Sequence, residues 1–185
     1  MAIGLLILWL TSINLRIFEL QCSVLIPTFA ASMRVLIVNT SEHTGGAAIA
    51  ANRLMLALRR SGVKVKMLVR DRQTDALTVE TVRQSWLLTV KFLWERFIVW
   101  LNNGRRRKGL FDVDIANTGT DITRLKVFEE ADVVHLHWTN QGFLSLGDME
   151  RILHSGKRVV MTLHDQWYFT GICHYSDRKS TRLNS

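Results

Sequence analysis

The sequence of 185 residues has little proline and little cysteine. It contains one proline and two cysteines, Cys22 and Cys173, against a hydrophobic content of 48%. This composition excludes a disordered chain and leaves enough apolar surface for one buried core. Two distant cysteines exclude a disulfide framework and a zinc-binding cysteine pair, so a reducing compartment, the cytoplasm, is expected. We expect one globular domain with additional chain at both ends.

Three common ligand-binding patterns are absent as well. The sequence has neither the complete glycine fingerprint of dinucleotide-binding proteins nor the Lys-Ser/Thr pair of a P-loop, so it predicts neither NAD binding nor ATP hydrolysis. No DNA- or RNA-binding motif accompanies the formal net charge of +8. The basic residues are concentrated at 105–108 and in the C-terminal tail, and such runs are usually solvated surface. We therefore expect no nucleic-acid partner.

The N-terminal 32 residues lack the features of a membrane anchor. Their apolar run, residues 1–10, is too short to span a bilayer, which takes about 20 apolar residues. No basic segment precedes it, as a signal peptide would require, although small residues at 30–32 leave a cleavage site as an alternative. We expect residues 1–32 to be an apolar extension outside the fold, introduced by an upstream start site, with Met33 as the true start.

A strand, a glycine turn and a helix open the expected domain. Residues 34–40 are mainly β-branched and aliphatic, which predicts a buried strand. Gly45 and Gly46 allow a sharp turn, and residues 47–60 show helical spacing that ends before Gly62. A helix N-terminus carries partial positive charge and unpaired N–H groups. The pattern therefore indicates a phosphate site, with an ordinary tight turn as the alternative.

The rest of the chain alternates between strands and helices. Strands are expected at residues 63–69, 129–138 and 158–163, and a short helix at residues 147–155. Residues 70–85 are polar and have no clean period, so a long loop is expected there. The alternation predicts an α/β fold, a Rossmann-like domain with a mostly parallel sheet and flanking helices.

Residues 86–101 predict a helix that is apolar on nearly all sides. Only a thin polar stripe passes through Lys91 and Glu95, so the helix must be covered. We expect it to pack in the core, against the protein's own sheet or a missing neighbouring domain. The alternative cover is an anionic membrane surface at the inner face of the cytoplasmic membrane, bound through Trp86 to Lys108, because tryptophans and a basic flank favour that interface.

Polar side chains gather where two of the expected strands end. His135, His137 and Trp138 end one strand, and His164 and Asp165 follow the other. Ligands of parallel sheets bind at the carboxyl ends of the strands. No third metal ligand lies at a useful spacing from the two histidines, so we expect hydrogen-bonded histidines and no metal. With the glycine turn, the two strand ends predict a convergent site.

Several of these motifs occur in one order that resembles the N-terminal half of a family 4 retaining glycosyltransferase of the bacterial branch. The segments that carry the resemblance are MRVLIVNT (33–40), GGAA (45–48), ADVVHLHW (131–138), TLHDQW (162–167) and TGICHY (170–175). The resemblance implies a GT-B architecture, in which two Rossmann-like domains enclose the active site. Residues 33–176 would be the N-terminal, acceptor-side domain.

The resemblance also implies an activity and a set of site residues. The family transfers a sugar from a nucleotide-linked donor to a glycan or lipid-linked acceptor with retention, generally without a metal or other cofactor, as in polysaccharide biosynthesis. By position, His164 would be the catalytic residue that faces the transferred sugar, and Asp165 would orient it. The other expected substrate-binding residues are Gly45, Gly46 and Ala47 near the donor diphosphate, and His137, Trp138 and Asn140 on the acceptor side.

One large part of the family pattern has no counterpart in the sequence. The second, donor-binding domain is missing, and the sequence after Tyr175 becomes polar and aperiodic. We expect residues 177–185 to be an unrelated or disordered tail, and the chain alone to transfer sugar very slowly or not at all. The alternative function is a non-catalytic Rossmann-like binding or interaction module, associated with a membrane through the apolar helix.

Overall fold

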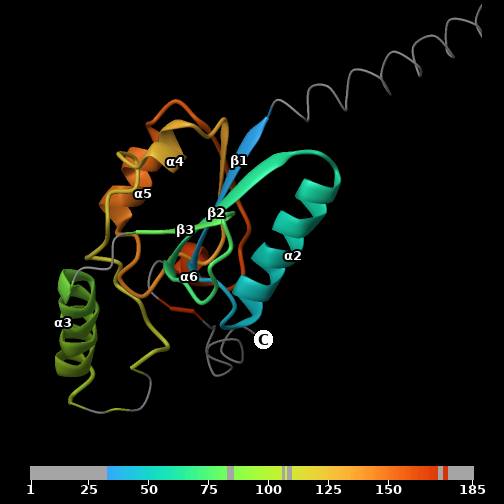
Figure 1. Ribbon diagram of the computed structural model, residues 1–185. Coiled ribbons are helices and arrows are strands. Elements are labelled where there is room, and N and C mark those ends of the chain that lie inside the picture. Colours follow the sequence, from blue (N-terminus) through green and yellow to red (C-terminus); the bar gives the residue numbers. More distant parts are fainter. Residues whose placement is uncertain (1–32, 83–85, 106, 108–109, 171–172, 175–185) are drawn as a thin grey trace, which may run out of the picture.

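The sheet of this protein has five strands in the order β3-β2-β1-β4-β5, and every neighbouring pair is parallel. A computed structural model describes residues 33–82, 86–105, 107, 110–170 and 173–174 (Figure 1). The expected extension and tail lie outside these residues. The parallel sheet with its flanking helices confirms the α/β Rossmann-like prediction. The strands are β1 (Arg34–Ser41), β2 (Lys64–Asp71), β3 (Val79–Thr81), β4 (Val133–Leu136) and β5 (Arg158–Met161).

Helices cover both faces of this sheet. Figure 1 shows α2 on one side and α4 and α5 on the other, while α3 stands at the margin of the molecule, away from α2. The helices are α2 (Gly46–Arg60), α3 (Trp86–Asn102), α4 (Lys126–Glu129), α5 (Leu146–Leu153) and α6 (Trp167–Thr170). The chain therefore leaves β1 toward one face and β4 toward the other.

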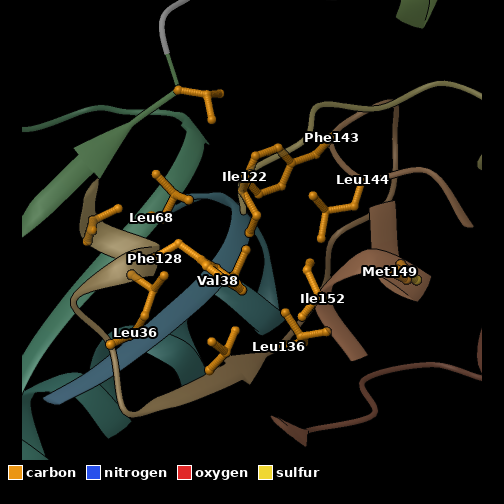
Figure 2. Packing of buried hydrophobic residues seen from close by; sticks show 14 of the residues in the cluster. Leu36, Val38, Leu68, Ile122, Phe128, Leu136, Phe143, Leu144, Met149 and Ile152 are labelled. Atoms are coloured by element: carbon orange, nitrogen blue, oxygen red, sulfur yellow. The ribbon is translucent and has the colours of Figure 1, made fainter. Parts of the chain in front are cut away.

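The central strand β1 is buried on both faces, which explains its continuous apolar sequence. Because successive side chains point to opposite faces, Leu36 and Val38 join one core cluster while Val35 and Ile37 join a second. Figure 2 shows the first cluster, in which β1 packs against α4, α5 and the segment between β4 and α5. The partners labelled there include Ile122, Phe128, Phe143, Leu144 and Ile152.

Most of the expected elements are present with small shifts in their ends. The prediction of a loop over residues 70–85 is wrong at Val79–Thr81, because β3 pairs there with β2 in parallel. The strand expected from Glu129 begins only at Val133, since Glu129 ends α4. A three-residue strand has too little length to show a period, and a single turn of helix likewise carries no pattern of its own.

The prediction that the apolar helix is covered by the sheet is wrong, whereas cover by a missing neighbouring domain stays a prediction. Seven large apolar side chains of α3 are exposed, whereas its charged residues Glu95 and Arg96 are buried. No helix among the described residues is long and apolar enough to cross a membrane. The exposed residues are Trp86, Leu87, Val90, Leu93, Trp94, Phe97 and Leu101.

Candidate functional site

A hollow with a volume of about 680 Å³ opens at the carboxyl ends of the strands. It lies beside the ends of β1 and β4, two neighbouring strands whose following helices cover opposite faces, which is where open parallel sheets bind ligands. The structure brings together six of the eight predicted site residues around this hollow. They are Gly45, Gly46, Ala47, Trp138, His164 and Asp165.

The glycine turn forms one wall of the hollow. Gly45 has φ of 90°, a left-handed conformation that favours glycine, and no side chain caps α2 behind it. The first helical hydrogen bond runs from Ile49 N to Gly45 O (3.2 Å), so the N–H groups of Gly46 and Ala47 precede the helical ladder. These amides and the positive end of α2 give this wall a preference for anions.

Glu42 holds this turn in place, although the sequence did not single it out. Its side chain is buried, and its Oε2 accepts hydrogen bonds from Gln73 N (2.6 Å) and Thr74 N (2.8 Å). Burial alone would raise the pKa of Glu42, but the hydrogen bonds from Thr74 and Gln73 outweigh it and lower the pKa. Glu42 therefore ties the turn after β1 to the segment after β2.

Three histidines form a chain that reaches the hollow at His164. His164 Nε2 lies 2.9 Å from His137 Nδ1, and the rings of His137 and His135 lie 4.5 Å apart. Burial is the main cause that lowers the pKa of all three, and it brings the pKa of His137 to about 4. His164 therefore presents a neutral imidazole at neutral pH, able to donate or accept a hydrogen bond but carrying no charge.

Asp165 has partners other than the one predicted for it. Its Oδ2 accepts hydrogen bonds from Trp138 Nε1 (2.8 Å) and from His174 Nδ1 (2.6 Å). Its Oδ1 accepts from Trp167 N (3.0 Å). The carboxylate thus positions Trp138 and His174, whereas His164 is held by His137.

His174 is a residue of this hollow that the sequence analysis missed. Its ring lines the hollow, and its backbone is fixed by a bond from His174 N to Asp112 O (2.9 Å). Because Asp165 bonds Nδ1, the carboxylate sets the orientation of the imidazole. His174 lies close to the end of the expected domain, outside the expected strands and helices, so the only signal for it was the TGICHY segment of the resemblance.

Two of the predicted substrate-binding residues lie behind the hollow. His137 is buried beneath His164, and Asn140 is buried with its backbone carbonyl bonded to Thr40 Oγ1 (2.9 Å). The side-chain amide of Asn140 makes no hydrogen bond within the described part of the chain. Both residues therefore support the wall and do not form it.

No group of three or more histidine, cysteine, aspartate or glutamate side chains is arranged to hold a metal among the described residues. Comparison with known proteins finds no matching family model, no matching curated protein and no matching solved structure.

Proposed function

We propose that this domain is the acceptor-side half of a retaining glycosyltransferase, which moves a sugar from a nucleotide-linked donor to a glycan or lipid-linked acceptor. One observation carries the proposal. An anion-binding turn and a polar wall that presents His164 and Trp138, more than 90 residues apart in the sequence, face the same hollow at the strand ends. A diphosphate-linked sugar carries an anionic diphosphate, which suits the turn, and sugar hydroxyl groups, which suit the opposite wall.

The glycine turn suits the diphosphate of the donor. Charge accumulates on the leaving phosphate as the bond to the sugar breaks, and fixed N–H groups stabilise such charge. Gly46 and Ala47 supply these groups at the start of α2. Asp71 also lines the hollow, but Arg70 pairs with its carboxylate at 2.6 Å, which reduces its repulsion of a phosphate.

The opposite wall suits the sugar and the acceptor. A neutral His164 exchanges hydrogen bonds with hydroxyl groups without favouring an ion, and Trp138 offers an aromatic surface beside it. In the proposed reaction the bond from C1 to the phosphate oxygen breaks and a bond from C1 to the acceptor oxygen forms on the same face. The acceptor proton passes to the leaving phosphate oxygen.

The proposed setting of the reaction is the cytoplasm, at the inner face of the cytoplasmic membrane. In the proposed transferase a second, donor-binding domain closes the hollow over the nucleotide, and we propose that the gene encodes it downstream of the codon for Tyr175. Sequencing the gene across and beyond that codon tests this part. A reading frame that continues into a second α/β domain is expected, and a true stop after Ser185 would contradict it.

Binding to the glycine turn can be tested on the chain itself. Inorganic pyrophosphate, titrated at low salt and followed by ¹⁵N NMR, should shift the amide signals of Gly45, Gly46 and Ala47. Gly45→Ala should weaken this binding about fivefold or more, because its φ of 90° strains any side chain and displaces the turn. The matched control is Gly156→Ala, which has φ of 76° and the same open surroundings at a distant turn.

Pyrophosphate shifts elsewhere than at this turn, or equal weakening by both variants, would count against the phosphate role. Catalysis is tested separately in the protein with its downstream frame restored, where His164→Ala should abolish sugar transfer while pyrophosphate binding persists. Sugar transfer that survives this substitution would remove His164 from the reaction.

A second candidate function is a non-catalytic Rossmann-like binding module. The exposed apolar face of α3 supports it, because an exposed apolar patch of this kind marks a site of interaction. The protein encoded by the restored reading frame can be assayed for sugar transfer and for binding to a partner through α3. Binding through α3 without transferase activity would favour this second function.

A further inference from the structure

Helix α3 is turned with its polar stripe toward the protein and its apolar side toward water. Glu95, Arg96 and Val99 are buried, and they recur at the spacing of one helical face. The exposed apolar residues follow one another on the opposite side. A helix of a water-soluble domain normally shows the reverse arrangement.

Polar contacts on the protein-facing side hold α3 in this orientation. Arg96 Nη1 donates to Leu110 O (2.7 Å) and to Val113 O (3.0 Å). Lys91 Nζ donates to Gly119 O at 2.7 Å. Rotating the helix to hide its apolar side would break these bonds and leave buried charges unpaired, which is costly. The exposed face is therefore a fixed feature of the domain.

The outward face has the composition of a helix that lies in a membrane interface. Trp86 and Trp94 are 73% and 53% exposed, and tryptophan is favoured where an apolar phase meets water. The single acidic residue of α3, Glu95, is fully buried, so the helix presents no negative charge to its partner. With 17 residues and about 1.5 Å per residue, α3 can lie along a bilayer.

Positive charge continues directly beyond the end of this helix. Arg105 and Arg107 are exposed, and they belong to the basic run at residues 105–108. Basic residues beside a membrane-bound helix are attracted to anionic headgroups, by about 1 kcal/mol each. One partner, an anionic lipid surface, thus matches the apolar stripe, the tryptophans, the lack of exposed negative charge on α3 and the basic flank.

We propose that the outward face of α3 docks the domain on an anionic lipid surface, with Arg105 and Arg107 at the headgroups. This interaction surface does not depend on the proposed sugar transfer. Within the transferase it would bring the strand-end hollow to lipid-linked acceptors, and within a binding module it would be the main site of attachment.

The test uses the full chain and vesicles in a sedimentation assay. The protein should bind phosphatidylcholine vesicles that contain phosphatidylglycerol at low salt, and should bind pure phosphatidylcholine far less. The pair Trp86→Ser and Trp94→Ser should reduce binding about tenfold or more, since both side chains lose apolar contact with the lipid. Arg105→Gln and Arg107→Gln should each reduce it about fivefold.

A matched control replaces two apolar residues that are even more exposed than the tryptophans but lie off α3. Leu77 and Phe169 are 94% and 77% exposed, so Leu77→Ser with Phe169→Ser should leave vesicle binding unchanged. All these substitutions lie on the surface, and unaltered thermal melts would show that each variant folds.

Three results would overturn the proposal. The first is that the protein does not bind anionic vesicles at low salt. The second is that the tryptophan substitutions leave vesicle binding unchanged, or that the control substitutions weaken it as much as the tryptophan substitutions do. The third is that the protein does not bind lipid but forms a dimer in sedimentation velocity, and that the tryptophan substitutions dissociate this dimer. That outcome would assign the face to a second copy of the chain.

Discussion

Replacing Glu95 by glutamine should stabilise this protein increasingly as the pH rises. Glu95 is fully buried, and its Oε1 accepts hydrogen bonds from Ile115 N (3.0 Å) and Ala116 N (3.1 Å). Its Oε2 makes no hydrogen bond within the described part of the chain. Burial, followed by the nearby Asp114 carboxylate, raises the pKa of Glu95 to about 7 against the opposing effect of Arg96.

The sign and size of the effect follow from this pKa. Between the ordinary value of 4.5 and about 7, folded Glu95 keeps a proton that the unfolded chain has lost. Folding therefore becomes less favourable as the pH rises through this window. At about 1.4 kcal/mol per pH unit, the accumulated cost above pH 7 is about 3 kcal/mol. Glutamine resembles the protonated acid and avoids this cost.

Urea unfolding of both proteins at about pH 5 and about pH 8 measures this difference. Near pH 5 the two free energies of unfolding should nearly agree, and near pH 8 Glu95→Gln should be more stable by about 3 kcal/mol. Effects of His137 cancel because both proteins contain it. Glu150→Gln, an exposed residue of α5, is the matched control and should show no pH-dependent gain. A difference for Glu95→Gln that stays constant or shrinks with pH would refute the reasoning.

Two further predictions concern a tightly packed glycine and a buried histidine. Gly119→Ala should lower the free energy of unfolding, measured by thermal unfolding, by about 2 to 4 kcal/mol, because its Cβ would meet Ser145 N at 2.1 Å and Asp148 Oδ2 at 2.2 Å and break the capping box of α5. The control Gly147→Ala, whose Cβ meets nothing closer than 3.9 Å, should lower it far less. Equal losses in the two variants would contradict the prediction. His137, with its pKa lowered from 6.5 to about 4, takes up a proton first in the unfolded chain, so stability is lost as the pH falls through this window. Relative to His137→Asn in urea titrations, the protein should lose about 2 kcal/mol between about pH 6.5 and about pH 4, and parallel pH profiles would show this to be wrong.

Local patterns were enough to predict the central elements of the fold. The strand expected at residues 34–40 is β1 (Arg34–Ser41), and the helix expected at residues 47–60 is α2 (Gly46–Arg60). Both are long enough to show a period, and Gly62, at φ of 83°, ends the helix region as expected. β3 was missed because three residues form a strand only through the ladder that β2 offers them.

The candidate site was partly visible in the sequence for the same reason. Carboxyl ends of parallel strands meet at one edge of a sheet, so His164 and Gly45 could be expected at a common hollow once the strands were recognised. The hydrogen-bond partners of the site residues could not be predicted in this way. Whether Asp165 contacts His164 or His174 depends on the pairing of residues 173–174 with residues 112–113, and no local period encodes that pairing.

Apolar periodicity and glycine conformation act over a few residues, so the sequence was enough to predict the α/β fold, the glycine turn at the start of α2 and the polar strand ends. Which side of α3 faces water depends on contacts between distant residues and could not be read from the sequence. Its apolar composition favours burial, yet Glu95 and Arg96 find buried backbone partners in residues 110–116, and those contacts turn the apolar side outward. Such long-range polar pairing outweighs the pattern of the helix, because an unpaired buried charge costs more than an exposed apolar face.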